Sequence, residues 1–537
     1  MNNVDIVCAS RPLWAHSLTE AAHAIRRGAC AASDYVEACI ARAREVDPCI
    51  HSYLYLAADE ARHEAGLREA ADAQGNASIL NGLPYGVKAT YDVAGWPSNS
   101  GSRLRAGRVA EQDAGLVAQL REQGAVCLGL LSTWEYGTGN GGEYFDLAHA
   151  PARNPWDTSR FTGGSSSGCG ASVVAGTSLF ALGSDTTGSV RLPAGATGAV
   201  GLIPTAGSFS LQGVLPNCYS LDTPGTFTRT AEDAAILFNA LARPGVARVG
   251  APDALARRGI AGMKVGVLRD PGPGFPGAGA PLAQGLEAGL LVLEQLGAEL
   301  TDVRLPVTVA ECFAVTRLIG PVESASIHEQ ELRERPGDMG FALRDKLMSG
   351  ALVRAVDYLA ALRRRSEIAQ QIRALLEDVD VLVTFGTLHL PPRLGVEPEM
   401  TAFTVETMLT PFNLAGVPAL VQCTGFSSTK PALPLHWQLV ARAGGEEAML
   451  RLAIAYEQAT SWRDYLPQPT PHAAPVPQFP ARAEQAVSAE EAAELALRYR
   501  LDGLAPDHLN RLRDLVRPAA AAGHLIQRVA DKTREPG

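Results

Sequence analysis

The sequence predicts a layered α/β architecture. Amphipathic helical segments alternate with short hydrophobic strands along much of the chain, a pattern typical of helices that pack on a sheet. The 537 residues are 46% hydrophobic, which is enough to bury a large core in one domain or two. Two turns rich in glycine and serine enclose an apolar segment at residues 169–182, so they interrupt a core rather than form a flexible tether.

The N-terminal part, residues 17–76, predicts three helices that cover a sheet. Ser17 and Glu20 have the spacing of a capping box, a second helix begins at Ser33, and a third spans residues 57–73. The predicted elements after them are a strand that carries Lys88, a helix over 113–123, strands over 124–130, 263–268 and 379–385, and helices over 282–296, 322–335 and 356–376.

The two turns read GGSSSG at residues 163–168 and GSDTTGSVR at residues 183–191. Glycine allows backbone N–H groups to crowd towards a ligand, and each turn adds a serine hydroxyl. Asp185 and Arg191 are expected to form an ion pair that holds the second turn. This arrangement is suited to nucleophilic chemistry, but a serine hydroxyl needs a base to become a nucleophile.

Lysine usage indicates where that base lies. Only five of the 47 basic residues are lysines, and Lys88 is the only lysine before Lys264. Arginine keeps its proton in proteins, whereas a desolvated lysine can be neutral near pH 7. Lys88 is therefore a candidate base, although composition alone also fits a chance surface lysine at a strand end.

A series of motifs in matching order gives this sequence its resemblance to the amidase signature family. The motifs lie at residues 86–88, 153–157, 163–168, 183–194, 201–205, 220–225, 228–234, 411–419 and 455–460. The resemblance extends to about residue 467. It implies the amidase signature fold, with a large mixed central β-sheet covered by helices on both faces.

The resemblance also implies a Ser–cis-Ser–Lys triad. Ser189 is then the nucleophile, Ser165 is the bridging serine after a cis peptide bond from Gly164, and Lys88 is the base. The backbone N–H groups expected to form the oxyanion hole belong to Thr186, Thr187, Gly188 and Ser189. Asp185, Arg191 and Ser166 are expected to support the site structurally.

The substrate pocket is less well defined by the sequence. The candidates are Trp134, Tyr136, Gly139, Asn140 and His436. Aromatic rings and a lone histidine near apolar residues are equally typical of a core. Residues 251–396 are the least family-like, and in related enzymes this region supplies the far wall of the pocket.

Two positions depart from the family pattern. Thr187 stands where the family usually has glycine, and a β-branched residue tolerates positive φ poorly, so the oxyanion geometry is expected to differ there. Ala89 stands where the family often has aspartate. Loss of that carboxylate makes a neutral Lys88 easier to reach.

The expected activity is hydrolysis of a carboxamide C–N bond through an acyl-enzyme. Alternatives are a carbamate- or urea-type amidohydrolase (urethane, allophanate or biuret-like) and the A-type subunit of an aminoacyl-tRNA amidotransferase. Residues 164–168 also fit G-x-S-x-G, the nucleophile elbow of α/β-hydrolases, with Ser166 as nucleophile, but no hydrophobic strand precedes them. A catalytically dead scaffold is disfavoured because Lys88, Ser165 and Ser189 are all present.

Composition excludes several other classes of protein. The net charge of −10 predicts that the protein has no nucleic-acid partner. No apolar run reaches the roughly 18–20 residues that a membrane span requires. No spacing of Cys and His predicts a metal site, and no cofactor is expected. The partner that the resemblance implies is a small-molecule amide, with no nucleic-acid or membrane partner. Nine scattered cysteines and the absence of a signal-like start predict a cytoplasmic protein.

The predicted domains are a catalytic domain over 1–466, a proline-rich linker over 467–484 and a helical extension over 485–537. The extension is expected to pack on the body or to mediate self-association, as in a homodimer.

Overall fold

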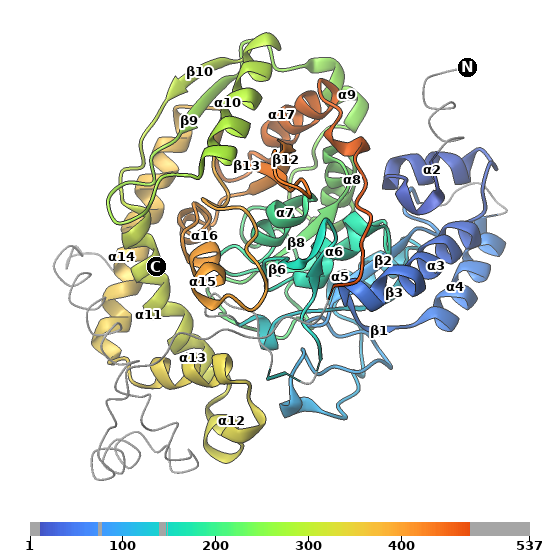
Figure 1. Cartoon of the computed structure of the whole chain (residues 1–537), viewed down its shortest axis with the longest axis horizontal. Helices are drawn as coiled ribbons and strands as arrows, with labels where there is room; N and C mark the ends of the chain where they lie inside the picture. Colours follow the sequence, from blue (N-terminus) through green and yellow to red (C-terminus); the bar gives the residue numbers. More distant parts are fainter. Residues whose placement is uncertain (1–10, 73–77, 139–145, 148, 473–537) are drawn as a thin grey trace.

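The computed structural model describes residues 11–72, 78–138, 146–147 and 149–472. A mixed sheet of 11 strands runs through the molecule (Figure 1). In sheet order its strands are β1 (Tyr53–Leu56), β3 (Val126–Leu131), β2 (Pro84–Lys88), β6 (Phe180–Asp185), β8 (Thr223–Thr228), β7 (Val200–Ile203), β12 (Ala419–Phe426), β13 (Pro434–Val440), β11 (Val381–Thr384), β9 (Lys264–Leu268) and β10 (Glu299–Asp302). A separate hairpin pairs β4 (Arg153–Asn154) with β5 (Asp157–Phe161).

Helices cover both faces of this sheet, as the sequence predicts. The helices are α2 (Leu18–Arg26), α3 (Ala32–Ile50), α4 (Ala58–Asp72), α5 (Gly115–Glu122), α6 (Ser167–Ala175), α7 (Arg191–Thr197), α8 (Ala231–Leu241), α9 (Pro252–Arg258), α10 (Ala280–Gln295), α11 (Val309–Ile327), α12 (Glu329–Glu334), α13 (Phe341–Ala351), α14 (Ala355–Glu377), α15 (Glu397–Val405), α16 (Thr410–Ala415) and α17 (Glu446–Gln458). Among these helices, none combines the length and the apolar character of a membrane-spanning segment.

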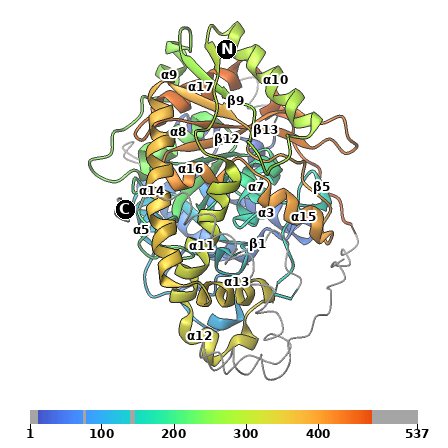
Figure 2. The ribbon, with the colours of Figure 1, turned by 90° about the vertical axis from the view of Figure 1, so that its left-hand side faces the viewer.

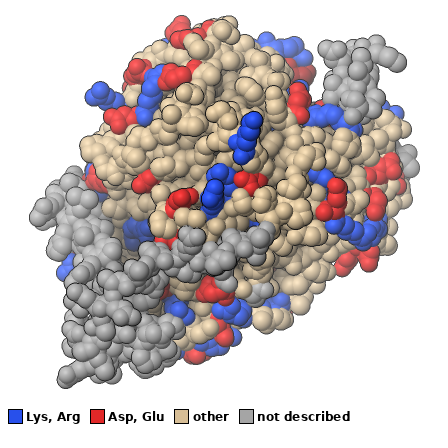
Figure 3. All heavy atoms as spheres, viewed as in Figure 1, with Lys and Arg blue, Asp and Glu red and all other residues tan. Residues whose placement is uncertain are grey.

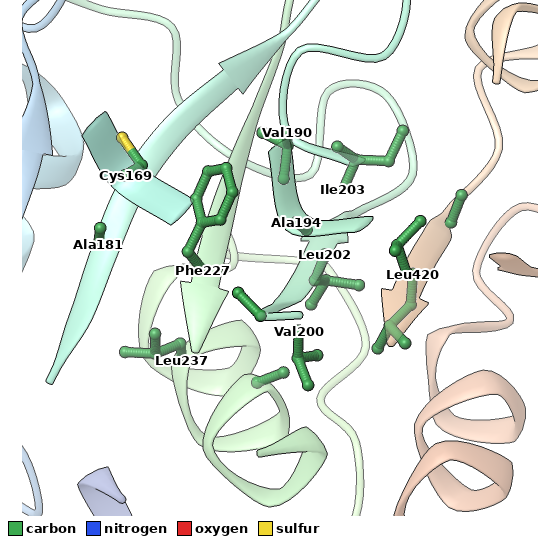
Figure 4. Packing of buried hydrophobic residues seen from close by; sticks show 14 of the residues in the cluster. Cys169, Ala181, Val190, Ala194, Val200, Leu202, Ile203, Phe227, Leu237 and Leu420 are labelled. Atoms are coloured by element: carbon green, nitrogen blue, oxygen red, sulfur yellow. The ribbon is translucent and has the colours of Figure 1, made fainter. Parts of the chain in front are cut away.

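Alternation along β7 shows how the core is divided between the two faces. A Cβ on Gly201 would lie 2.5 Å from Ala194, so this position faces α7. Its neighbours Val200 and Leu202 point to the opposite face, because successive residues of a strand alternate. Leu237 of α8 lies with them there (Figure 4).

The same alternation places α7 and α10 on opposite faces of β13. A Cβ on Gly195 of α7 would lie 2.7 Å from the ring of His436. A Cβ on Gly289 of α10 would lie 2.6 Å from the ring of Trp437, the next residue of the strand. Both glycines thus allow a helix to lie close to a large ring of the sheet.

Helices α11–α14 form a group beside the sheet (Figures 1 and 2). Helix α11 packs against α13, α14 and α16. The sequence predicts a helix over 322–335, and this prediction is wrong at its start, because α11 runs through Pro321 and ends at Ile327. The carbonyl of Pro321 would lie 2.0 Å from a Cβ at Gly350, so close packing on α13 holds α11 together at a residue that usually disrupts helices.

Most other predicted elements are present, with ends shifted by a few residues. The sequence analysis did not predict β1, a short edge strand between the second and third helices. Residues 467–472 of the predicted linker lie against the β4–β5 hairpin, where the Thr158 hydroxyl and the Arg153 guanidinium donate to the carbonyls of Thr470 and His472. The rest of the linker and the predicted helical extension lie outside the described residues.

The sheet brings the strand of Lys88 and the second glycine turn together at the carboxyl ends of two neighbouring strands. Strands β2 and β6 are parallel neighbours, with Val87 paired to Leu182. Lys88 ends β2, and Asp185 ends β6. In α/β sheets, ligands bind at the carboxyl ends of the parallel strands.

Candidate active site

Lys88 is fully buried at the end of β2. Its Nζ donates hydrogen bonds to Ser165 Oγ at 2.7 Å and to Ser184 Oγ at 3.0 Å. Burial lowers the pKa of Lys88 to about 8, against the opposing effects of Cys169, Asp222 and Asp185. The amine is therefore held among hydroxyl groups, and its neutral form is within reach at ordinary pH.

Ser165 lies in the first glycine turn, between a strand and α6. The peptide bond between Gly164 and Ser165 is cis. The Ser165 carbonyl accepts the N–H of Trp134 at 3.1 Å. A Cβ on Gly164 would lie 2.1 Å from the Trp134 ring, so the close approach of this turn to Trp134 requires glycine. Packing on Trp134 thus fixes the position of the Ser165 hydroxyl beside Lys88.

Ser189 lies in the second turn and lines a cavity of about 120 Å³. The Ser189 side chain is 9% exposed, and its hydroxyl has no hydrogen-bond partner in the described residues. The two turns are joined through the backbone, because the N–H of Ser166 donates to the Ser189 carbonyl at 3.2 Å. The structure contains no direct hydrogen bond between Ser165 and Ser189 in the described residues.

One of the four predicted oxyanion-hole donors is already bonded within the second turn. The N–H of Gly188 donates to Asp185 Oδ1 at 2.7 Å and therefore points away from the cavity. The N–H groups of Thr186, Thr187 and Ser189 have no acceptor within the described residues, and all three residues line the cavity. Three of the four predicted N–H groups are thus unbonded in the described structure, and the oxyanion hole itself stays a prediction.

Thr187 does not adopt the positive φ that a β-branched residue tolerates poorly. Among the described non-glycine residues, positive φ occurs at His51, Ser100 and Tyr136. Thr187 is not one of them, and the unusual backbone conformation falls on Gly188, with φ of 131°. The turn therefore accommodates a β-branched residue in front of the glycine.

Asp185 and Arg191 form a fully buried ion pair, with Arg191 Nη2 3.1 Å from Asp185 Oδ1. Burial raises the pKa of Asp185, but Arg191 and the surrounding donors reverse this effect and hold the pKa below its usual value. The carboxylate also accepts the N–H groups of Gly188 and Val190 and the amide of Asn413. The pair thus fixes the turn that carries Ser189.

Ser166 has a different environment from the serines on either side of the site. It is fully buried and does not line the cavity. Its hydroxyl donates to the Ser184 carbonyl at 3.2 Å and accepts the Ser184 N–H at 3.4 Å. The hydroxyl therefore ties α6 to β6 and is not available as the nucleophile of an elbow.

The pocket candidates are only partly brought together. Trp134 lines the cavity. Tyr136 is buried and stacks edge-on against His328, outside the cavity lining. His436 is buried beneath α7, and its Nε2 accepts the N–H of Thr387 at 3.1 Å, so it lies away from the cavity. Gly139 and Asn140 lie outside the described residues.

The far wall of the cavity comes from residues that the sequence analysis did not single out. They are Asn217, Phe313, Thr316, Arg317, Gly320, Pro321 and Lys346. Most belong to α11 and α13, in the region that is least family-like. The scarcity of lysines that indicated Lys88 could also have indicated Lys346. The position of Ser184 next to Asp185 in the second turn could have identified Ser184 as a site residue.

Two observations describe how the charged side chains of the described residues are distributed. No group of three or more His, Cys, Asp or Glu side chains there is arranged to hold a metal ion. On the face seen in Figure 3, basic and acidic side chains are mixed around a broad uncharged area. The expectation of no nucleic-acid partner stays a prediction.

Comparisons with known proteins agree with this arrangement. The family model described as Amidase matches residues 34–450. The A-type subunit of glutamyl-tRNA(Gln) amidotransferase from Roseiflexus castenholzii is 31% identical over 492 residues, which cover 85% of this chain and 98% of that protein. An inhibitor-bound structure, described as a vestigial protein complex that reveals the origins of an s-triazine catabolic enzyme, matches with a TM-score of 0.75 and 30% identity over 82% of this chain and 98% of its own. A 6-aminohexanoate cyclic dimer hydrolase complexed with substrate matches with a TM-score of 0.75 and 26% identity, over 85% of this chain and 99% of its own.

Proposed function

This chain belongs to the amidase family, and from that premise we propose that it hydrolyses the C–N bond of a small carboxamide through an acyl-enzyme on Ser189. One observation carries the proposal. The buried amine of Lys88 lies 2.7 Å from the Ser165 hydroxyl, beside a cavity that Ser189 lines. A buried amine, a bridging hydroxyl and a second hydroxyl at a cavity are the parts that a proton relay to a serine nucleophile needs.

The proposed reaction moves one proton in each direction. Neutral Lys88 takes the proton of Ser165, and Ser165 takes that of Ser189 as Ser189 Oγ bonds to the amide carbon. The relay then runs backwards, protonates the amide nitrogen, and the C–N bond breaks with release of the amine. Water attacks the resulting ester through the same relay, releases the acid and restores the Ser189 hydroxyl.

The oxyanion of the intermediate is proposed to accept hydrogen bonds from the N–H groups of Thr186, Thr187 and Ser189. These amides line the cavity, whereas Gly188 donates to Asp185. A well-placed donor of this kind stabilises a transition state by roughly 3–4 kcal/mol. Because the donors are backbone groups, the Asp185–Arg191 pair acts indirectly by holding their turn.

A second candidate function is that of the A-type component of an amidotransferase, which the likeness to such a protein over nearly its full length supports. The nucleophile is the same in that case, but the released ammonia passes to a partner chain. A carbamate- or urea-type amide is a third substrate class for the same attack on a carbonyl carbon. The reaction on Ser189 is therefore best tested before the substrate is known.

A fluorophosphonate probe followed by intact-mass measurement tests the nucleophile directly. We expect wild type and Ser166→Ala to gain one adduct on Ser189, and Ser189→Ala to gain none. Ser166→Ala is the matched control, because its hydroxyl also lies in a glycine turn but bonds to Ser184. An adduct on Ser166, or labelling that survives in Ser189→Ala, contradicts the proposal.

Ammonia or amine release from alkyl, aryl, carbamate and urea-type amides then distinguishes the substrate classes. Release by the isolated chain supports a stand-alone hydrolase. Labelling of Ser189 together with glutaminase activity that appears only after addition of partner subunits favours the amidotransferase function.

A further inference from the structure

The charged side chains among the described residues that line the cavity at Ser189 are both basic. Lys346 of α13 and Arg317 of α11 both line it, and no Asp or Glu among the described residues does. The remaining lining is formed by glycines, hydroxyl groups, an amide and apolar side chains. A cavity walled by cations without carboxylates attracts an anionic ligand.

Lys346 is held in place with one donor to spare. It is half-buried, and its Nζ donates to Asn217 Oδ1 and, at 3.4 Å, to Thr138 Oγ1. An ammonium group has three N–H donors, so one remains for a ligand. Asn217 in turn donates to Thr186 Oγ1 at 3.2 Å. Lys346 is therefore connected through one side chain to the turn that carries Ser189.

Burial lowers the pKa of Lys346, and the negative charges of Asp222 and Glu323 raise it to a smaller extent, but the hydrogen bonds of these carboxyl groups go to other groups. Asp222 accepts the Thr186 hydroxyl at 2.6 Å and the N–H groups of Asn217 and Cys218 at 2.8 and 2.9 Å. Glu323 accepts the N–H and hydroxyl of Ser220 at 2.9 and 2.7 Å. Neither carboxyl lines the cavity or makes a hydrogen bond to Lys346 in the described structure. The Lys346 ammonium therefore faces the cavity without a carboxylate partner there.

Arg317 provides a second cation at a more exposed position. Its guanidinium lies 4.8 Å from the centre of the Phe313 ring on the same helix, which orients it at the wall of the cavity. The pKa of Lys346 is lowered to about 8 by burial, so its charged form still predominates at pH 7. Both groups thus carry positive charge where a substrate would lie.

From this we infer that the amide substrate bears a carboxylate, which binds to Lys346 and Arg317 while its amide carbon lies at Ser189. The inference rests on the proposed function and narrows its substrate class. The two cations then act as specificity residues that do not take part in the proton relay. A charged donor to a carboxylate is worth about 10- to 100-fold in affinity.

The test is competition against fluorophosphonate labelling of Ser189, read by intact mass. The competitors are succinamate, glutaramate and adipamate, each compared with its diamide, in which a neutral carboxamide of equal size replaces the carboxylate. In wild type we expect the carboxylate-bearing member of the best pair to halve the labelling rate at a 10- to 100-fold lower concentration. The measured quantity is the ratio of the two concentrations, diamide to acid, that halve the labelling rate. In Lys346→Met this ratio falls towards one, and Arg317→Gln reduces it to a smaller extent.

Two further measurements separate the possible failures. Lys264→Met removes an exposed lysine from β9 and is the matched control, so it keeps the wild-type ratio. Lys346→Arg keeps the charge and is expected to recover part of the ratio that Lys346→Met loses. Equal competition by acids and diamides in wild type, or a ratio unchanged in Lys346→Met, overturns the inference while Ser189 labelling still supports the proposed function. Absence of any adduct on Ser189 instead overturns the proposed function.

Discussion

Two lysines belong to the candidate site, and they differ in their surroundings: Lys346 lines the cavity, whereas Lys88 is bonded to Ser165 and does not line it. Lys88, at the end of β2, is fully buried among the hydroxyls of Ser165 and Ser184. Lys346, on α13, is half-buried and donates to the side chains of Asn217 and Thr138. Burial lowers the pKa of both to about 8.

The comparison teaches that the partners of a buried amine, more than its pKa, indicate its role. A hydroxyl can either donate or accept, so Lys88 can exchange a proton with Ser165. The shorter bond of Lys346 goes to the amide oxygen of Asn217, which only accepts and so holds the amine as a donor, and the Thr138 hydroxyl is a longer contact at 3.4 Å. The first arrangement fits a base, and the second fits an anchor for an anion.

The largest expected effect comes from removing each amine in turn, which tests whether Lys88 and Lys346 have different roles. Lys88→Met is expected to lower kcat/KM by roughly 10²–10⁴-fold on every amide, because it removes the general base. Lys88→Arg gives no rescue, since arginine keeps its proton. Lys346→Met should lower kcat/KM on a neutral amide far less than Lys88→Met does, because Lys346 takes no part in the proton relay. Steady-state ammonia release measures all three variants, and a comparable loss from both methionine variants on the neutral amide contradicts the division of roles.

The next largest effect concerns the turn that carries Ser189. Asp185→Asn leaves Arg191 fully buried without its carboxylate, and loss of one partner of a buried pair costs about 3–5 kcal/mol. We expect the free energy of unfolding, measured in denaturant, to fall by about that amount. Asp253→Asn disrupts the exposed pair with Arg257 and serves as the control, with an unchanged unfolding midpoint. An Asp185→Asn protein as stable as wild type would show that the pair does not hold the turn.

The pH dependence of kcat/KM distinguishes the roles of the two lysines, because Lys88 acts as a neutral amine and Lys346 as a charged one. Lys88 must be neutral, so kcat/KM on a neutral amide should rise about tenfold per pH unit below about 8 and level off above it. Lys346 must be charged, so preference for a carboxylate-bearing amide should fall above about 8. A rising profile for the neutral amide and a bell-shaped one for the acid are expected. A neutral-amide profile that falls through this range excludes Lys88 as the base.

The regions around Lys88 and Lys346 also differ in how far the sequence predicts them. The strand of Lys88 and the second glycine turn are local patterns, and their meeting follows from the parallel pairing of β2 and β6. The first glycine turn follows β5 of the separate hairpin, so its place beside Lys88 depends on tertiary packing. The commitment of the Gly188 N–H to Asp185 depends on turn geometry that the residue types do not specify. The cavity wall of Arg317 and Lys346 is formed by α11 and α13, which tertiary packing brings together. Because proline usually disrupts a helix, the sequence predicted a helix that begins after Pro321 and missed the part of α11 that carries Arg317. His436 shows the opposite error, because a histidine near apolar residues proved to be buried beneath α7.

The smallest expected effect comes from Ser184, the second hydroxyl beside Lys88. Its Oγ accepts a hydrogen bond from Lys88 Nζ at 3.0 Å and so favours the charged amine. Ser184→Ala removes this acceptor and leaves the Ser184 carbonyl, at 3.4 Å, and Ser165 as partners. The pKa of Lys88 should then fall, and the rising limb of the neutral-amide profile should move to lower pH. The plateau should change by less than about tenfold, because one neighbouring hydroxyl contributes about 1 kcal/mol.

The matched control for this shift is Ser166→Ala, which removes a hydroxyl of the same size that bonds to the Ser184 backbone and not to Lys88. Its limb should stay at the wild-type pH, even if stability falls. A shift of equal size in both variants would mean that packing around β6, rather than the hydroxyl partner, sets the protonation of Lys88. A shift confined to Ser184→Ala ties the base to its own hydrogen bonds, which is the property that distinguishes Lys88 from Lys346.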